Sequence, residues 1–334
     1  MEHSKSVLIL GGSGQAGAST AALLRRWHPE LPLTIAGRDL GRAQRVADEL
    51  GAADAVTIDL RRGDLGLPGG RSHSAVVATV WDSRLNGLRY AQDHGLPYLS
   101  ISSGLMDLTP EVIAGAQRTT AAPILLASHC LAGLVVLAAL DAAREFAHVE
   151  TVHMAAVLDE QDAGGPAAIE DMERLMAVSM AGLVRRDGVF TWIGGAEAEA
   201  VEVACADGVV LPGQRVAIPD VPSVALATGA PNVHFDLAAG ESTSRRRGGP
   251  PSIEFRIDIE GTSPAGTPLT TTRHLTHPEG QRPLTALGIT LGIEHLLGLH
   301  GPLPTPGLHT PESLIDPTYA TTRMTEIGTL PITP

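Results

Sequence analysis

The sequence is poor in lysine and tyrosine, and this scarcity limits the acid–base chemistry available to the chain. Among its 334 residues there is one lysine, Lys5, and there are three tyrosines, Tyr90, Tyr98 and Tyr319. A Schiff-base mechanism needs a lysine inside a site, whereas Lys5 stands just before the first expected strand. No tyrosine has a lysine four places later, so the Tyr-x-x-x-Lys pair of short-chain dehydrogenases is absent. Acid–base chemistry must therefore come from His, Asp, Glu or Cys.

Cysteine, basic clusters and long apolar runs are scarce as well. The two cysteines, Cys130 and Cys205, form neither a disulfide framework nor a metal-binding pattern. No apolar run reaches the roughly 18 residues of a membrane span, and the N-terminus lacks the order of a signal peptide. The net charge is −13, and the only basic cluster is Arg245-Arg246-Arg247, so phosphate backbones would be repelled. We therefore expect a cytoplasmic protein that binds neither nucleic acid nor a membrane.

The first half of the chain alternates short apolar runs with helical patterns, which is typical of a parallel sheet with crossover helices. The expected strands are Val7–Leu10, Leu33–Ala36, Ala55–Ile58, Ala75–Val80, Tyr98–Ile101 and Pro123–Ala127. The expected helices between them are Ala16–Arg26, Leu40–Leu50, Arg84–His94 and Pro110–Arg118. Six strands in this order indicate a doubly wound, Rossmann-type domain.

Beyond residue 130 the pattern changes to that of an α+β domain. The expected helices are Ala132–Phe146, Ala167–Val184 with Met172, Met176 and Met180 at spacing four, and Leu284–Leu297. The expected strands are Thr151–Leu158, Val189–Ile193, Ala200–Ala204, Gln214–Ile218, Val233–Leu237, Ile253–Glu260 and Leu269–Leu275. Because most of these strands have no helix between them, the second sheet should be mixed or antiparallel. The polar stretch Glu241–Pro251, rich in Gly and Pro, predicts a mobile loop.

These patterns predict an α/β protein of two domains, as its length suggests. We expect a Rossmann domain over residues 1–130 and an α+β domain over residues 131–280. Residues 281–334 should form a C-terminal helix and a tail that packs back on the first domain.

The most specific motif is Gly12-Ser13-Gly14-Gln15-Ala16-Gly17, which follows the apolar run VLIL and directly precedes a helix. In a G-x-G-x-x-G motif the first glycine permits a tight turn, the second lets a pyrophosphate approach the backbone, and the third lets helix and strand pack closely. The phosphates then lie at the N-terminus of the helix, where free N–H groups and the helix dipole favour anions. Because the motif joins a strand to a helix, it predicts dinucleotide binding rather than a purely structural turn.

The end of the second expected strand selects the nucleotide. NAD-binding chains usually carry an acidic residue there for the ribose hydroxyls, whereas an arginine suits the 2′-phosphate of NADP. Here Arg38 can stack on the adenine and pair with a phosphate, which favours NADP. Asp39 leaves an alternative open, because it could cap the helix that begins near Leu40 or face the ribose and reverse the preference.

Other cofactor contacts are expected at the carboxyl ends of the remaining strands. Asp59 and Leu60 follow the third strand and should border the adenine. Ala78, Thr79 and Ser102 lie at the ends of the fourth and fifth strands and should line the nicotinamide side.

VLILGGSGQAG followed by TIAGRDLGRAQRVADEL resembles the NADP-binding domain of the saccharopine dehydrogenase (reductase) family, and GLHTPESLIDP with the later EIG is similar to the ending of that family. The resemblance is specific over Val7–Leu60 and diffuse beyond. It implies a Rossmann domain, a substrate domain on a mixed sheet, homodimers, and hydride transfer to a C=N or C=O centre of a small metabolite, often an imine of an amino acid. The family commonly has an Asp-Pro-Gly-like turn before the second domain, where this chain has His129-Cys130-Leu131-Ala132-Gly133. The identity of the substrate does not follow from the resemblance.

His129 and Cys130 are the candidate catalytic residues, since they follow the last expected strand of the first sheet. His129 could be an acid, a base or a substrate contact, or could only cap and pack. Cys130 could be a thiol nucleophile, as in semialdehyde dehydrogenases, although a buried, inert cysteine is more common. Three functions therefore stay open: an NADP-dependent reductase, a Cys130-dependent aldehyde dehydrogenase, and a non-enzymatic NADP(H) sensor that binds a partner protein.

Further polar residues lie in the second half. Asp159, Glu160 and Asp162 could hold a substrate amino group or cap a helix, and Arg273, His274 and His277 could hold a carboxylate or be surface residues. His153 and His234 lie within expected strands and are interpreted as core or interface histidines. No His, Cys or Asp cluster has the spacing of metal ligands, and hydride transfer needs no metal, so none is expected.

Overall fold

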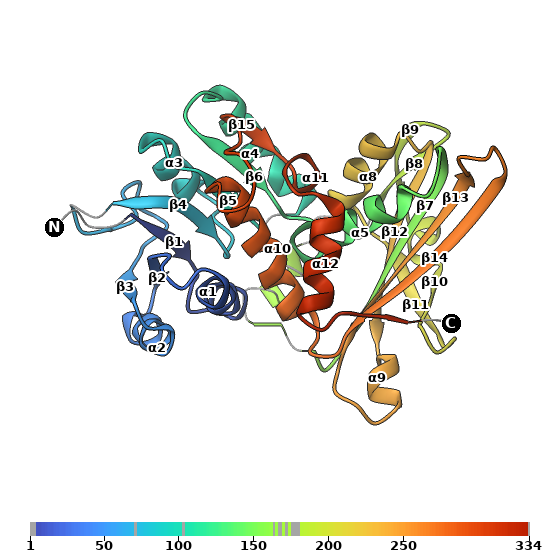
Figure 1. Ribbon diagram of the computed structural model, residues 1–334, viewed down its shortest axis with the longest axis horizontal. Coiled ribbons are helices and arrows are strands. Elements are labelled where there is room, and N and C mark those ends of the chain that lie inside the picture. The colour runs from blue at the N-terminus through green and yellow to red at the C-terminus, as the bar shows by residue number, and fades with distance from the viewer. Residues whose placement is uncertain are drawn as a thin grey trace. The chain divides into compact units, whose positions relative to one another are not determined.

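The computed structural model describes residues 5–69, 72–101, 104–162, 164–165, 169–170, 173–174 and 181–332. The chain forms two compact units, each with one sheet (Figure 1). The first unit comprises Met1–Ser128, Gly164–Asp171 and Thr285–Ile315, and the second comprises His129–Ala163, Met172–Leu284 and Asp316–Pro334. The expected α/β class, with a parallel sheet followed by a mixed one, is confirmed.

The first unit is built on a parallel sheet in which the described residues form seven strands. In spatial order these are β15 (Gly307–His309), β6 (Pro123–Leu126), β5 (Tyr98–Ser100), β4 (His73–Ala78), β1 (Ser6–Leu10), β2 (Leu33–Gly37) and β3 (Ala53–Thr57). The strand order reverses between β1 and β4, which is where ligands bind in such sheets. Every residue of β1 and β2 is buried, as expected for strands covered on both faces.

Helices cover both faces of this sheet. Figure 1 shows α1 (Gln15–Trp27) and α2 (Leu40–Leu50) on one face, and α3 (Asn86–Asp93) and α4 (Leu105–Gln117) on the other. The six expected strands and four expected helices are confirmed, with shifted ends. The sequence did not predict β15, which pairs with β6 through Leu308 and its neighbours and extends the sheet.

The second unit contains a mixed sheet in which the described residues form nine strands. The main path runs β10 (Val201–Ala204), β11 (Val210–Arg215), β12 (Asn232–Gly240), β7 (His148–Asp159), β13 (Ile253–Thr262), β14 (Pro268–His277) and β16 (Leu330–Ile332). Off this path, β8 (Ala181–Arg186) pairs with β12 and β9 (Val189–Gly194). Only β7 and β12 run parallel among the described pairs of this sheet.

The other elements of the second unit are mostly short helices. They are a 3-10 turn η1 (Cys130–Gly133), α5 (Leu134–Ala143), α7 (Ala196–Glu199), α8 (Asp220–Thr228), α9 (Thr243–Arg246) and α12 (Pro317–Glu326), while α10 (Gln281–Leu296) and α11 (Pro311–Leu314) complete the fold. Contacts join α5 to α12, to α8 and to the central strands β7 and β13. None of the described helices is long and apolar enough to cross a membrane.

Two expectations for the second half were wrong in part. The helix expected over Ala167–Val184 does not reach its end, because Ala181–Arg186 is the strand β8. Asp187 and Gly188 have φ of +48° and +80° and turn the chain into β9, so this Asp-Gly pair was an overlooked hairpin signal. Met172, Met176 and Met180 lie outside the described residues. In place of the strand expected at Gln214–Ile218, the structure has β11, which begins at Val210 and ends at Arg215.

The expected mobile loop over Glu241–Pro251 instead contains a short helix that ion pairs hold in place. Its helix α9 begins after Ser242, whose hydroxyl accepts a hydrogen bond from the Arg245 N–H group. The Nε atom of Arg245 lies 3.1 Å from Asp159 Oδ2, and the Nε atom of Arg246 lies 2.7 Å from Asp207 Oδ2. The arginine cluster of the sequence therefore serves the fold.

Candidate functional site

The glycine-rich turn leads from β1 into α1 and is held by the backbone of β2. The N–H groups of Gly11 and Gly12 both donate to the Ala36 carbonyl, at 2.9 and 3.0 Å, and the Gly14 N–H donates to the Gly11 carbonyl at 2.8 Å. Gly11 has a φ of +80°, which favours glycine. The turn therefore needs a glycine one place before the motif that the sequence analysis singled out.

The three motif glycines are required for different reasons. A Cβ atom on Gly12 would lie 2.9 Å from the Ile9 carbonyl oxygen, and one on Gly17 would lie 2.5 Å from the Gly11 carbonyl oxygen. The packing of the chain itself thus explains Gly12 and Gly17. A Cβ atom on Gly14 would meet only the Gly11 carbonyl oxygen, at 3.1 Å. Packing therefore excludes a side chain less strongly at Gly14 than at Gly12 and Gly17.

The N-terminus of α1 lies directly after Gly14. Gly14 is the N-cap residue, with φ −82° and ψ 173°, and in the described part of the chain no side chain caps the helix. The first turn also carries no acidic residue. The helix has 13 residues, so its first N–H groups and its dipole favour an anion here.

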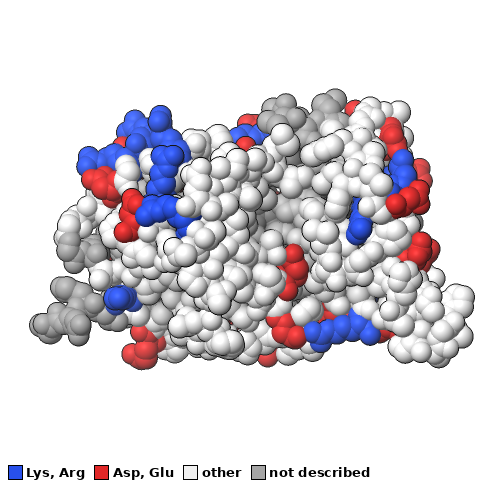
Figure 2. Space-filling model, turned by 90° about the horizontal axis from the view of Figure 1, so that it is seen from above, with Lys and Arg blue, Asp and Glu red and all other residues white. Residues whose placement is uncertain are grey.

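The end of β2 lies beside this turn. A Cβ atom on Gly37 would lie 2.9 Å from Ser13 Oγ, so Ser13 of the motif packs against the residue that precedes Arg38. Arg38 is exposed and makes no ion pair with any residue that the structure describes. Figure 2 shows the largest group of basic side chains on one face of the molecule gathered at its left end. The overall charge of −13 therefore does not exclude an anionic ligand.

Asp39 adopts the capping role. Its Oδ1 accepts a hydrogen bond from the Arg42 N–H group at 3.1 Å, at the beginning of α2. One carboxylate oxygen of Asp39 therefore caps α2, and this bond holds the side chain at the beginning of the helix.

Replacing Asp39 with alanine should lower the free energy of unfolding by about 0.5–2 kcal/mol, since an N-cap is lost. Asp39→Asn should keep the wild-type stability, because asparagine caps equally well. Urea unfolding of both variants checks this prediction. If Asp39→Asn instead weakened NADH binding tenfold while its stability stayed constant, the carboxylate would serve the ribose.

Asp59 and Leu60, expected beside the adenine, follow β3 and have partners within the protein. Both carboxylate oxygens of Asp59 accept hydrogen bonds from Arg61, at 2.9 Å each. These bonds lower the pKa of Asp59 to about 2, so the carboxylate is charged at neutral pH. Leu60 is half-buried against the core, and its carbonyl accepts a hydrogen bond from Asn86. Their contact with a nucleotide stays a prediction.

On the other side of the turn, Thr79 joins β4 to β1. Its N–H and hydroxyl groups donate to the Leu10 carbonyl at 2.9 and 2.8 Å. Its Oγ1 would lie 2.9 Å from a Cβ atom on Gly17, so the structure brings Thr79 and the motif together. Ala78 is buried at the end of β4. Ser102 lies outside the described residues.

The sequence analysis overlooked two buried carboxylates at the ends of these strands. Asp82 accepts hydrogen bonds from the N–H groups of Gly87 and Arg84, at 2.6 and 3.2 Å, and burial raises its pKa. Glu111 of α4 accepts a hydrogen bond from Ser100 Oγ of β5 at 2.7 Å. No sequence motif marks either residue. The partners of Asp82 follow it within five residues, whereas only the fold brings Glu111 close to Ser100.

In the second unit, His129 and Cys130 are buried or half-buried and have polar partners. His129 Nε2 lies 2.8 Å from Ser223 Oγ, and its Nδ1 has no hydrogen-bond partner among the described residues. Burial lowers the pKa of His129 to about 3, so its ring is neutral at pH 7. The Cys130 N–H donates to Asp220 Oδ2 at 2.9 Å. Burial, and then the Asp220 carboxylate, raise the pKa of the Cys130 thiol, so it stays protonated.

The backbone after Cys130 is strained. Leu131 and Ala132 have φ of +53° and +55°, and Gly133 has φ of +97°. For residues other than glycine this conformation costs roughly 1–2 kcal/mol each. Such strain is concentrated at functional sites, which supports a role for this turn. The helix expected from Ala132 consequently begins only at Leu134.

The remaining candidates are paired within the second unit. Asp159 and Glu160 both pair with Arg245, and Asp162 Oδ2 accepts a hydrogen bond from the Gln281 N–H at 2.7 Å. Arg273 pairs with Glu145. These contacts give each of them a structural role. The sequence analysis interpreted His153 and His234 as core or interface histidines and did not consider Asp236, whereas the sheet brings the three residues together. The spacing of His234 and Asp236 was a signal, since it places both on one face of a strand.

No protein-family model matches the sequence, and no curated protein sequence matches it either. Among solved structures, the chain is similar to apo saccharopine dehydrogenase (L-Glu forming) from Saccharomyces cerevisiae, with a TM-score of 0.68, 13% identity, and coverage of 99% of this chain and 100% of that one. Scyllo-inositol dehydrogenase from Lactobacillus casei has a TM-score of 0.48 and 10% identity, over 98% of this chain and 99% of that chain. A myo-inositol dehydrogenase from Corynebacterium glutamicum has a TM-score of 0.47 and 14% identity, over 99% and 100%. Along its whole length, the chain has the fold of the yeast saccharopine dehydrogenase.

Proposed function

We propose that the protein is an NADP-dependent oxidoreductase that transfers a hydride to or from a C=N or C=O centre of a small, amino-acid-derived metabolite. The observation that carries this proposal is Gly14. Of the three motif glycines, it is the one whose lack of a side chain is least explained by packing within the protein. It directly precedes an uncapped helix N-terminus at the point where the strand order of the sheet reverses. The fold shared with a saccharopine dehydrogenase supports the reaction class.

The residues of the turn fit the cofactor. The N–H groups at the beginning of α1 would bind the diphosphate, and the exposed guanidinium of Arg38 would bind the 2′-phosphate. A bound nicotinamide supplies or accepts the hydride. His129 is neutral, and its Nδ1 has no hydrogen-bond partner in the part of the chain that the structure describes, so it would form one hydrogen bond to the substrate rather than act as a charged acid.

Calorimetry with NADPH, NADP+, NADH and NAD+ tests the first step. We expect one NADPH per chain, bound more tightly than NADH. Turnover is then measured as loss of the nicotinamide absorbance with panels of amines and 2-keto acids. An absence of heat with all four nucleotides would refute the proposal, and binding without turnover would favour the sensor.

The thiol mechanism makes a separate prediction. Because burial and Asp220 keep Cys130 protonated, Cys130→Ser should change turnover by less than about tenfold, and Cys205→Ser serves as the matched control. Removal of a true nucleophile costs several orders of magnitude, roughly a thousandfold or more. A loss of that size for Cys130→Ser alone would establish the aldehyde dehydrogenase mechanism instead.

We also propose that the protein is a cytoplasmic homodimer, as the family resemblance implies. Light scattering of the purified chain tests the oligomeric state. A monomer at all concentrations used in the activity assay would contradict it.

A further inference from the structure

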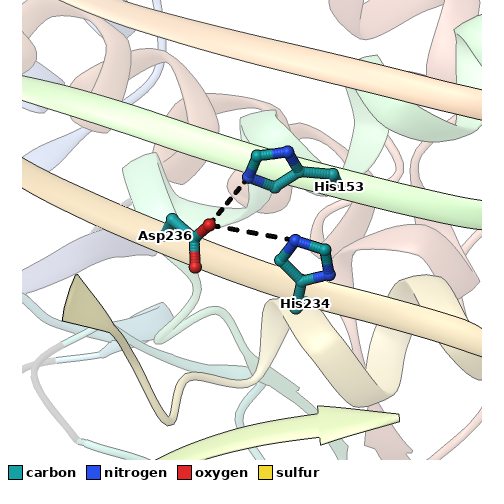
Figure 3. A group of neighbouring side chains, drawn as sticks. All are labelled: His153, His234 and Asp236. Atoms are coloured by element: carbon teal, nitrogen blue, oxygen red, sulfur yellow. Dashed lines mark ion pairs between the residues drawn. The ribbon is translucent and has the colours of Figure 1, made fainter. Parts of the chain in front are cut away.

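Two histidines and an aspartate of the second unit converge on the face of its sheet (Figure 3). His153 of β7 is paired in register with His234 of the neighbouring parallel strand β12. Asp236 follows His234 by two residues and so lies on the same face. One ligand atom from each residue lies within 4.8 Å of the other two.

We propose that His153, His234 and Asp236 form a binding site for a divalent transition-metal ion, with Zn²⁺ as the best match. Imidazole nitrogens and a carboxylate oxygen are ligands that zinc prefers, and three protein ligands leave a fourth position for water or a small ligand. The Nε2 atoms of both rings face the same oxygen, Asp236 Oδ2, at 2.9 Å for His153 and 3.8 Å for His234.

The two imidazoles offer lone pairs. His153 Nε2 is buried and faces Asp236 Oδ2 at 2.9 Å. The rings of His153 and His234 stack at a centroid distance of 4.3 Å, with the Nε2 atoms of both near Asp236 Oδ2.

A second layer of residues orients the ligands. Arg215 Nε lies 2.9 Å from Asp236 Oδ1, which leaves Oδ2 to face the histidines. Asp258 Oδ2 lies 3.6 Å from His153 Nδ1, on the far side of the ring. At this distance the Asp258 carboxylate acts on the ring through its charge rather than through a hydrogen bond, and a carboxylate behind a histidine raises the basicity of a metal ligand.

The charges around the three ligands determine how tightly the site binds a metal ion. Arg215 and Arg256 pair with Asp236 and Asp258, so the group is formally neutral when both histidines are neutral. A dication is therefore attracted less strongly than to a site built from thiolates. We expect an exchangeable ion rather than one that the fold requires.

The test is a titration of the full chain, without a histidine tag and after treatment with a chelator, with Zn²⁺ by calorimetry and with Co²⁺ by visible absorption. We expect one ion per chain, a Co²⁺ spectrum of a nitrogen-ligated site, and an unfolding temperature that Zn²⁺ raises. His153→Gln and His234→Gln should each lose at least about a hundredfold in affinity, and Asp258→Asn about 10–100-fold, as for other outer partners.

His148→Gln is the matched control, because His148 lies on the same strand beside Glu150, at 3.4 Å, but outside the cluster. It should bind Zn²⁺ as the wild type does. Circular dichroism shows whether each variant is folded. Equal Zn²⁺ affinity in folded wild type, His153→Gln and His234→Gln, or no binding by the wild type, overturns the proposal.

Discussion

Gly14→Ala should weaken NADPH binding at least tenfold, about 1.4 kcal/mol, while the unfolding temperature stays close to that of the wild type. A methyl group at Gly14 would meet only the Gly11 carbonyl oxygen, at 3.1 Å, and the backbone of Gly14 is extended, which any residue adopts. This contact is tight, and a shift of the turn by a few tenths of an ångström relieves it, whereas a pyrophosphate that must approach the backbone leaves no room for the methyl group. Calorimetry and thermal unfolding of the same preparation measure both effects.

Gly17→Ala is the comparison variant in which we expect the loss to fall on stability. Its methyl group would lie 2.5 Å from the Gly11 carbonyl oxygen and 2.9 Å from Thr79 Oγ1. Overpacking costs about 1–3 kcal/mol, and the better helix propensity of alanine returns up to about 1 kcal/mol. We expect a net loss of stability of about 1–2 kcal/mol. Normal NADPH binding by folded Gly14→Ala would contradict a diphosphate at Gly14, and full stability of Gly17→Ala would contradict the structural role of Gly17.

Arg38→Ala should weaken NADPH binding about 10–100-fold and leave NADH binding nearly unchanged. The charge-assisted hydrogen bonds of a guanidinium with a phosphate contribute about 1.5–3 kcal/mol, and only NADPH carries the 2′-phosphate. Calorimetry with both nucleotides at two salt concentrations measures the difference, which should shrink at high salt.

Arg45→Ala serves as the control for Arg38, because Arg45 is an exposed arginine of α2. It should bind both nucleotides like the wild type. Unaltered NADPH affinity in Arg38→Ala, or an equal loss for NADH, would refute the cofactor preference.

The sequence predicts the first sheet well because its central strands are buried on both faces and so read as continuous apolar runs. Val7–Leu10 and Leu33–Ala36 lie within β1 and β2. The short β15 escaped prediction because three residues show no periodicity, and its strand partner lies far away along the chain. The order in Glu241–Pro251 escaped for a similar reason, since Arg246 pairs with the distant Asp207.

The candidate sites also have parts that the sequence predicts and parts that it does not. The glycine motif is contiguous in the sequence, so its place at the end of β1 was predictable. The sequence offered capping of α2 as one of two roles for Asp39, since the partner Arg42 is only three residues away. It could not predict that His129 is neutral and bonded to Ser223, because burial and a distant partner decide both properties. His153 and His234 stand 81 residues apart, and only the register of β7 and β12 brings them together.

The pairing of β15 with β6 has a consequence for how the protein is made. A nascent chain presents β1 to β6 long before residues 307–309 leave the ribosome, and at 5–20 residues per second this delay is roughly 10–40 s. Until then β6 is an open strand edge. The surface of Leu99 and Leu125, which Gly292 of α10 later covers, stays exposed as well. A fragment that stops at Ser128 should therefore aggregate, and folding in the cell should depend on chaperones that hold this edge during synthesis.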